Sequence, residues 1–400
     1  MTSPPLRLIA TAAFGLEAVV GRELRRLGYE PDQVENGRVA FTADRAAICR
    51  CNLWLRSADR VLLEMGSFEA RDFGELFDRT TSLPWSDWLT AEASFPVRGK
   101  SVRSTLHSVP DCQSIVKKAV VENLKQAYGK SWFDEDGPSM PIEVSIVKDT
   151  ATLSIDTTGA GLHKRGYRTL SGPAPLKETL AAGLVQISDW RHDRPFVDPF
   201  CGTGTLPIEA ALIAHNLAPG LNRNFAAESW PQIDGKLWSA AREEARDLAP
   251  GQSAFTLIGT DLDEGPLSLA RHHARQAGVE SSIHFQQKAF ADFTTSRKYG
   301  CIVCNPPYGE RAGSQHEAEA LYHQMGKVFS GLPTWSFYVL TSHRRFESII
   351  GRKSDKRRKL YNGPIACTYY QFFGPRPPRQ RATEADSKEP QRQRDTEEEE

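Results

Sequence analysis

Residues 305–308, Asn-Pro-Pro-Tyr, could activate an amine. They follow the apolar run 301–304, which is typical of a buried strand, and the prolines end that strand. The lone pair of an exocyclic base amine is delocalised into the ring, so the amine is a poor nucleophile. The Asn305 amide oxygen and the carbonyl of the conformationally fixed Pro306 could each accept an N–H of the amine and so localise the lone pair on its nitrogen. Tyr308 could stack on a base taken out of its helix. The alternative is a simple strand-ending turn.

A glycine turn lies upstream, after the short apolar strand 195–198. Gly202 and Gly204 permit a tight turn and close backbone approach, and an apolar helix follows whose N–H groups point back at the turn. Pro207 stands where the dinucleotide-binding fingerprint has its third glycine, which disfavours a pyrophosphate ligand. Asp198, at the strand end, suits an ammonium group.

Two further carboxylates follow predicted strands. Asp261 ends the strand in 256–263, and a carboxylate at that place accepts hydrogen bonds from ribose hydroxyls. Asp292 lies just beyond the third strand, in 283–293, where an adenine amine could be recognised. Each aspartate alone is more typical of a helix cap or a turn. Their order along the chain favours a nucleoside-binding site.

The segments 198–205, 259–263 and 305–311 together resemble S-adenosylmethionine-dependent methyltransferases that modify exocyclic amines. The closer resemblance is to the RNA guanine-N2 methyltransferases with a THUMP domain, in particular the N-terminal half of the bacterial bifunctional 23S rRNA enzyme. Residues 158–168 and 217–225 match the same subgroup. Judged by these motifs, the resemblance extends over roughly residues 5–374. In the bifunctional relatives a second methyltransferase follows; this chain ends at residue 400, so we expect that second activity to be absent.

The resemblance implies S-adenosylmethionine as the methyl donor and a role for each motif residue. The residues expected to bind the donor are Asp198, Phe200, Cys201, Gly202, Gly204, Asp261, Leu262, Asp292 and Asn305. Those expected to act on the amine are Asn305, Pro306, Pro307 and Tyr308. A strong base is not required, because the amine can lose its proton after the methyl group has arrived. Position and electrostatics would carry the rate.

The expected fold is α/β, a doubly wound Rossmann-like methyltransferase sheet preceded by an α+β ferredoxin-like/THUMP module. Residues 1–70 are assigned to the ferredoxin-like part, 71–160 to a THUMP RNA-binding domain and 161–374 to the methyltransferase domain. Residues 375–400 contain mainly proline, charged and polar residues, and are expected to be disordered.

The partner expected from local charge and from the resemblance is RNA, most specifically 23S rRNA or a large-subunit precursor. Residues 97–130 carry seven Lys/Arg against two acids, and the helix expected there, capped by Asp111, turns lysines outward. The candidate RNA-binding residues are Lys100, Arg103, Lys117 and Lys118. A solvated helix face is the alternative. A second basic run, 342–361, connects the last two predicted strands and could flank the substrate groove.

Two connecting segments have open roles. In the linker 157–175, Arg165 and Arg168 could touch RNA or only face solvent. Residues 216–254 are longer than a simple crossover needs, which indicates either a functional insertion or one whose tryptophans only pack it to its own sheet.

Overall composition excludes little. Lys+Arg and Asp+Glu both number 50, so net charge does not indicate a polyanionic partner. No run approaches the roughly 18 apolar residues of a membrane span, and residues 1–5 lack a signal peptide's apolar core, so we expect a cytoplasmic protein without membrane contact. The seven cysteines favour reduced thiols. Because Cys301 and Cys304 have no second Cys/His pair at ligand spacing, we expect no metal.

Three alternatives remain open, and the oligomeric state is not indicated. A tRNA guanine-N2 methyltransferase would share both the loop and the THUMP resemblance. An adenine-N6 DNA methyltransferase would share the loop but not normally the N-terminal part. A non-catalytic RNA-binding ribosome-assembly factor would be expected to have lost at least one of the motif residues.

Overall fold

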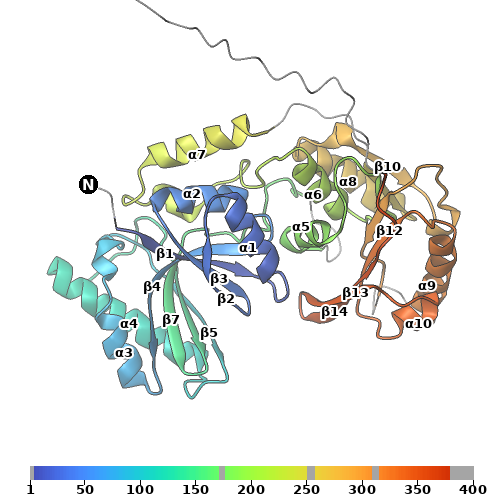
Figure 1. The fold of residues 1–400 in the computed structure, drawn as a ribbon. Helices are drawn as coiled ribbons and strands as arrows, with labels where there is room; N and C mark the ends of the chain where they lie inside the picture. The colour runs from blue at the N-terminus through green and yellow to red at the C-terminus, as the bar shows by residue number, and fades with distance from the viewer. Residues whose placement is uncertain (1–3, 171–175, 250–256, 309–314, 379–400) are drawn as a thin grey trace, which may run out of the picture.

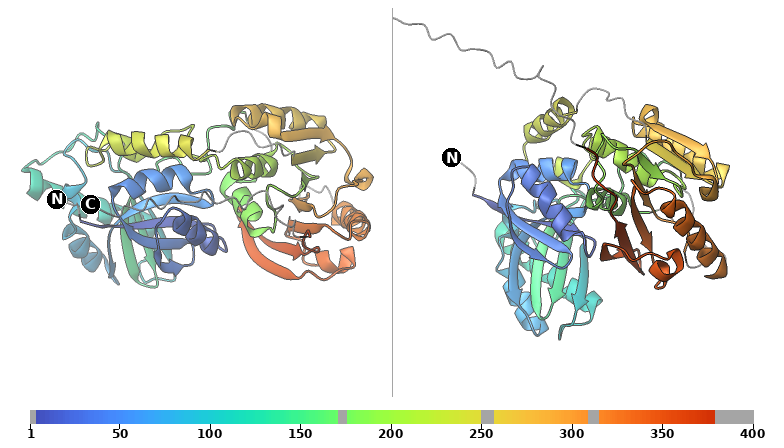
Figure 2. Two further views of the ribbon diagram at one scale, coloured as in Figure 1. Left: turned by 45° about the horizontal axis from the view of Figure 1, so that its top comes forward. Right: turned by 45° about the vertical axis from the view of Figure 1, so that its right-hand side comes forward.

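The computed structural model describes residues 4–170, 176–249, 257–308 and 315–378. These residues form two seven-stranded sheets, one from each half of the chain, which lie side by side (Figures 1 and 2). Parts of several predictions fall outside the described residues, namely Thr256, the loop residues 309–311, the linker residues 171–175, the insertion residues 250–254 and the tail residues 379–400.

The N-terminal sheet has the order β2-β3-β1-β4-β7-β6-β5. Its strands are β1 (Leu6–Ala12), β2 (Pro31–Glu35), β3 (Arg38–Ala43), β4 (Ala58–Glu69), β5 (Val97–Val102), β6 (Ile142–Val147) and β7 (Thr150–Asp156). Its helices are α1 (Glu17–Arg26), α2 (Arg45–Trp54), α3 (Phe73–Thr81), η1 (Trp85–Asp87) and α4 (Val109–Tyr128). The pair β5–β6 is parallel and the other neighbours are antiparallel.

The main helices pack on one face of this sheet because their apolar residues recur at helical spacing. In α1, Val19, Val20 and Leu24 are fully buried, as the spacing predicts, and Gly28 follows in the left-handed region at φ +88°. The helix predicted to be capped by Asp111 begins earlier: Val109 is the first residue of α4 and Asp111 lies in its first turn. The prediction that Asp111 caps this helix was wrong. Proline is compatible with the first turn of a helix, so the helix begins before Pro110 and Ser108 occupies the cap position.

β4 joins the predicted ferredoxin-like and THUMP parts in one sheet. Its 12 residues are long enough to pair with β1 through Leu63 and, on its other edge, with β7 as far as Glu69. The sheet therefore continues across the boundary expected at residue 70.

The C-terminal sheet has the order β10-β9-β8-β11-β12-β14-β13. Its strands are β8 (Phe196–Asp198), β9 (Leu257–Asp261), β10 (Ile283–Gln287), β11 (Cys301–Cys304), β12 (Ser336–Thr341), β13 (Lys356–Asn362) and β14 (Ile365–Phe372). The helices of this half are α5 (Glu178–Ile187), α6 (Thr205–Ala214), η2 (Ala226–Ser229), α7 (Gly235–Asp247), α8 (Glu264–Gln276), η3 (Glu280–Ser282), η4 (Phe290–Asp292), α9 (Gln315–Ser330) and α10 (Phe346–Ile350). Strands β8 to β12 run parallel, whereas β14 and β13 are antiparallel to their neighbours. The expected α/β fold class is confirmed.

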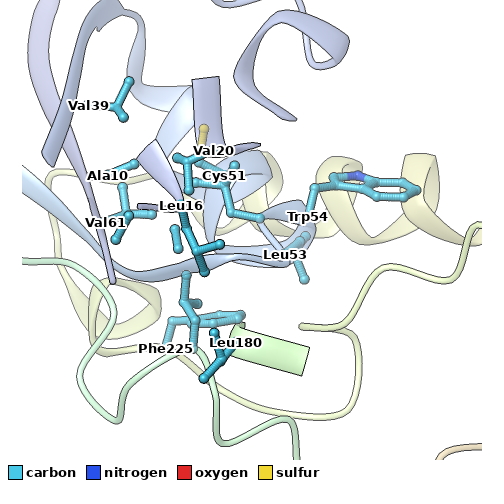
Figure 3. Packing of buried hydrophobic residues seen from close by; sticks show 14 of the residues in the cluster. Ala10, Leu16, Val20, Val39, Cys51, Leu53, Trp54, Val61, Leu180 and Phe225 are labelled. Carbon is cyan, nitrogen blue, oxygen red and sulfur yellow. The ribbon is translucent and has the colours of Figure 1, made fainter. Parts of the chain in front are cut away.

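The two halves are joined by a shared core. Leu180 of α5 and Phe225 of the insertion lie against Leu16 and Leu53 of the N-terminal half (Figure 3). The backbone N–H of Gly220 donates to the carbonyl of Leu53 at 2.9 Å. Such packing, continuous from one half to the other, fixes their relative position.

The insertion, residues 216–254, attaches the C-terminal half to the N-terminal half. Its Trp230 indole donates to the carbonyl of Ser139 at 3.0 Å, and Glu244 of α7 pairs with Arg50 of α2 at 2.7 Å. Figures 1 and 2 show α7 lying along α2. The insertion therefore packs on the N-terminal half, and the alternative that its tryptophans only pack it to its own sheet was wrong.

Within the described ranges, no helix combines the length and apolarity that crossing a membrane requires.

Candidate active site

The glycine turn connects β8 to α6. Gly202 has φ +51° and Gly204, the residue before α6, has φ +82°. A Cβ on Gly204 would lie 2.9 Å from the Cβ of Ala270 in α8, so Gly204 allows α6 and α8 to pack closely. A Cβ on Gly202 would meet no atom within 4 Å. Because Gly202 has no side chain, a ligand can approach its backbone closely from the open space beside it.

Two carboxylates hold the turn from neighbouring strand ends. Asp261 accepts the backbone N–H of Gly202 through Oδ2 at 2.8 Å and that of Asp263 through Oδ1 at 3.2 Å. Asp198 is 1% exposed and accepts the backbone N–H of Phe200 at 3.1 Å. Burial raises the pKa of Asp198 well above its ordinary value, and the nearby Asp261 carboxylate adds to this. A positive group would therefore be strongly favoured beside Asp198.

A pocket of about 410 Å³ lies in front of this turn, which we call the strand-end pocket. It lies where the strand order reverses between β8 and β11, at the carboxyl ends of the parallel strands. The predicted residues that line it are Asp198, Phe200, Cys201, Gly202, Asp261, Leu262, Asn305 and Pro307. The predicted residues Gly204, Asp292, Pro306 and Tyr308 are not in this lining.

The sequence did not predict more than half of the residues in the pocket wall. The lining residues not predicted are Leu176, Pro199, Thr203, Thr205, Leu206, Pro266, Lys288, Ala289, Phe290, Ala291, Leu321 and Gln324. Most are apolar, and four of them, Pro199, Thr203, Thr205 and Ala291, adjoin a predicted residue, so position after a strand end was the available signal for these four. Asp292 itself is exposed at the end of η4, beside the lining residue Ala291. Leu262 is 72% exposed and offers an apolar surface to the pocket.

The loop after β11 presents one unsatisfied acceptor to the pocket. Among the described residues, the buried Oδ1 atom of Asn305 has no hydrogen-bond partner. The carbonyl of Pro307 accepts from the Tyr322 hydroxyl at 3.3 Å, which fixes the loop to α9. A buried polar atom without a partner is costly, and a donor from a ligand would satisfy it.

Tyr308 faces away from the pocket. It is 5% exposed, and its hydroxyl accepts from the Asn362 amide at 2.9 Å, at the end of β13. In this conformation the ring is covered, so the stacking surface predicted from the sequence is not open.

Burial also excludes a reactive thiol. It raises the pKa of both Cys201 and Cys304 well above the ordinary value, which keeps them protonated. No cluster of three or more His, Cys, Asp or Glu side chains suited to a metal occurs in the part of the chain that the structure describes.

The linker before α5 supports the pocket from behind. Arg168 donates to the Thr205 hydroxyl at 2.6 Å and pairs with Glu178 at 3.1 Å. Arg165 is 3% exposed and pairs with the fully buried Glu209 of α6 at 3.4 Å. Arg165 therefore neither touches solvent nor is accessible to RNA, and both interpretations of this residue were wrong.

The predicted RNA-binding residues do not form one surface. A Cβ on Gly99 would contact Val109 and Gln113 of α4, so the next residue, Lys100, lies on the opposite face of the sheet, where it pairs with Glu143 at 3.6 Å.

The two lysines on α4 already have partners. Lys117 pairs with Glu135 and lies 3.6 Å from the centre of the Phe95 ring, and Lys118 lies 5.7 Å from that of Phe77. Arg103, just after β5, is exposed.

Comparison with known proteins agrees with these motifs. The family model "RMKL-like, methyltransferase domain" matches residues 165–371. The models "RlmL ferredoxin-like domain" and "THUMP domain" match residues 7–62 and 70–156. The resemblance stated from the sequence is confirmed for all three parts.

Relatives cover nearly the whole chain. "Putative RNA methyltransferase YpsC" of Bacillus subtilis (strain 168) is 50% identical over 379 residues, 94% of this chain and 98% of the relative. The crystal structure of a "predicted N6-adenine-specific DNA methylase" from Listeria monocytogenes is 52% identical, covering 93% of this chain and 97% of that one, with a TM-score of 0.88. SMU.472, crystallised with SAH, is 46% identical, covering 94% and 100%, also with a TM-score of 0.88. The chain therefore belongs to the RMKL-like methyltransferase family.

Proposed function

We propose that this RNA methyltransferase transfers the methyl group of S-adenosylmethionine to the exocyclic N2 of a guanine in 23S rRNA or a large-subunit precursor. The observation that carries the proposal is the buried, unpartnered Asn305 Oδ1, which shares one pocket with Asp198 and Asp261.

The pocket fits the methyl donor. Its volume of about 410 Å³ lies within the range of small-molecule sites. The buried Asp198 carboxylate would pair with the donor's ammonium group, and Asp261 would accept from the ribose hydroxyls. Leu262 and Phe290 would cover the adenine. SMU.472 was solved with SAH, the product that the donor becomes, which supports the same ligand here.

The chain's own contribution to the reaction is electrostatic. S-adenosylmethionine supplies an electrophilic methyl group on a positively charged sulfur. Asn305 Oδ1 and the Pro306 carbonyl would each accept an N–H of the guanine amine, which localises its lone pair and stabilises the charge that develops on nitrogen. The loop that would carry these acceptors is fixed to α9, since the Pro307 carbonyl accepts from the Tyr322 hydroxyl, and both proline φ angles are restricted by their rings.

Tyr308 would act in two ways. While covered, its hydroxyl bond to Asn362 holds the loop against β13. Stacking on the target base requires the ring to be uncovered when the base enters.

The test is label transfer from S-adenosylmethionine to separate pools of unmodified 23S rRNA, tRNA and DNA, followed by identification of the methylated nucleoside. We expect N2-methylguanosine in rRNA alone. Asn305→Ala should lower kcat by about 10²–10³, by analogy with the loss of one oxyanion-hole donor, whereas Asn305→Asp keeps an acceptor oxygen and should lose less. S-adenosylmethionine affinity, measured in parallel, separates loss of chemistry from loss of the pocket.

Other outcomes would select another substrate. N2-methylguanosine in tRNA would retain the chemistry and change the RNA. N6-methyladenosine in DNA would agree with the name given to the Listeria relative. Transfer to none of the pools would favour a non-catalytic assembly factor.

A further inference from the structure

A second cavity lies beside the catalytic loop. It has a volume of about 240 Å³. Its walls come from the turn after β1 (Phe14), from β4 (Asp59), from the start of α5 (Lys177, Thr179), from the end of β13 (Tyr361) and from the turn that follows it (Gly363). We call it the Phe14 cavity. It is therefore built from both halves of the chain, where the end of the β13–β14 hairpin faces the N-terminal half (Figure 1).

Two connections place the Phe14 cavity next to the proposed reaction site. Leu176 lines the strand-end pocket, and the next residue, Lys177, lines the Phe14 cavity. Asn362, between Tyr361 and Gly363, donates to the hydroxyl of Tyr308 at 2.9 Å. A polynucleotide whose target base reached Asn305 would therefore place a neighbouring nucleotide close to this cavity.

A hydrogen bond and a close backbone approach hold the two halves together beside the Phe14 cavity. Arg358 of β13 donates to the carbonyl of Gly15 at 2.9 Å. Gly15 has φ +89°, and a Cβ there would lie 2.6 Å from the carbonyl oxygen of Lys359. Only glycine permits this approach, which keeps Phe14 beside Tyr361.

The aromatic residues of the cavity have the features of a base-stacking site. Phe14 is 43% exposed, although it is a large apolar side chain. Its ring centre lies 5.9 Å from that of Tyr361 with an interplanar angle of 82°, and an edge-on pair leaves the faces of one ring free. Aromatic faces bind bases of any sequence by stacking.

The charges of the cavity suit a ribonucleotide. Lys177 is exposed and, in the part of the chain that the structure describes, pairs with no carboxylate. Lys359 does not line the cavity, but its ammonium group lies 5.5 Å from the centre of the ring of Tyr361, which does. Asp59 accepts from the Thr179 hydroxyl through Oδ1 at 2.8 Å, and the remaining acceptor capacity of its carboxylate could receive a ribose 2′-hydroxyl, a group that DNA lacks.

We propose that the Phe14 cavity is a second subsite of the enzyme, which holds the ribonucleotide next to the target base with its base against Phe14 and Tyr361 and its phosphate at Lys177. This inference rests on the proposed function, in that it assumes an RNA base entering at Asn305.

The first test compares Phe14→Leu, which keeps an apolar side chain, with Phe14→Tyr, which keeps the ring. The KM for the RNA that the wild-type protein methylates should rise about 5- to 30-fold in Phe14→Leu and stay within about twofold in Phe14→Tyr, since base stacking depends on the ring. The dissociation constant of S-adenosylmethionine, measured by calorimetry, should not change in either variant.

The second test measures the salt dependence of RNA binding by fluorescence anisotropy. Lys177→Gln should lower the slope of log K against log salt by about 0.7, the value for one phosphate contact on a single strand. The matched control is Lys236→Gln in α7, which should leave the slope unchanged.

The outcomes are distinguishable. If the wild-type protein methylates RNA and Phe14→Leu retains its KM, the subsite is overturned and the proposed function stands. If Phe14→Leu weakens S-adenosylmethionine as much as RNA, the ring only supports the fold and the subsite is again overturned. If the wild-type protein methylates no RNA, the proposed function fails and the subsite with it.

Discussion

The buried ion pair between Arg165 and Glu209 gives a sharp prediction about stability. Both side chains are almost completely buried, at 2% and 0% exposure, and the pair is closed by bonds to neutral groups. Arg165 donates to the carbonyl of Leu162 at 2.9 Å and to that of Arg56, and the Tyr167 hydroxyl donates to Glu209 at 3.2 Å. Removal of one charged partner leaves the other buried without its counter-charge, at a cost of about 3–5 kcal/mol.

We expect Arg165→Met and Glu209→Gln each to lower the free energy of unfolding by about that amount, measured by urea denaturation with tryptophan fluorescence. The double variant Arg165→Met/Glu209→Met should lose less than the sum of the two single effects by at least about 2 kcal/mol, because neither Arg165 nor Glu209 is then left buried without the other. A loss below about 1 kcal/mol in Arg165→Met, or strict additivity in the double variant, would refute the reasoning.

Three further predictions concern the pocket and the contact between the halves. Gly204→Ala should destabilise the fold, because the new Cβ would lie 2.9 Å from the Cβ of Ala270. Gly202→Ala, whose Cβ would meet no atom within 4 Å, should be more stable than Gly204→Ala but should bind S-adenosylmethionine weakly. Equal losses of stability in thermal unfolding would contradict this. Burial raises the pKa of Asp198 and a bound ammonium would lower it, so donor binding should release a proton at pH values between the lowered pKa of the bound state and the raised pKa of the free state. Affinity should rise with pH across that window. Asp198→Asn should remove the dependence, and calorimetry in two buffers counts the proton. Gly15→Ala should raise the KM for RNA and lower the thermal midpoint, because its Cβ would lie 2.6 Å from the Lys359 carbonyl; an unchanged midpoint would show that the hairpin moves freely.

The sequence was sufficient for the parts of the site that follow strand ends. Asp198, Asp261 and Asn305 are far apart along the chain, yet all three line one pocket, because the carboxyl ends of parallel strands meet at one edge of the sheet. Apolar runs such as 301–304 and 195–198 identified these strands without knowledge of their neighbours.

Strand β13 could not be recognised in this way. It begins with four consecutive basic residues, Lys356 to Lys359, and only Leu360 in it is fully buried. The run was therefore interpreted as a basic connection. As the edge strand of the sheet, β13 pairs on one side only, and charged residues are usual on such an edge.

Partners distant in sequence decided the remaining differences. Arg165 is buried because it pairs with Glu209, and the Tyr308 side chain is covered where its hydroxyl binds Asn362. A spacing pattern describes which face of an element is apolar, but it does not identify the residue that arrives from another element to cover a side chain.

The insertion has a consequence for substrate selection. Because Trp230 binds Ser139 in the THUMP part and Glu244 pairs with Arg50 in the ferredoxin-like part, the insertion fixes the distance between the C-terminal half, which holds the strand-end pocket, and the THUMP part of the chain. A protein with a free hinge could reach guanines at many distances from the RNA element that it grips. In this chain the distance between the THUMP part and the strand-end pocket is instead set by the contacts of the insertion. An RNA would then be selected by the spacing between its gripped element and its target nucleotide, even where the sequence around that nucleotide varies.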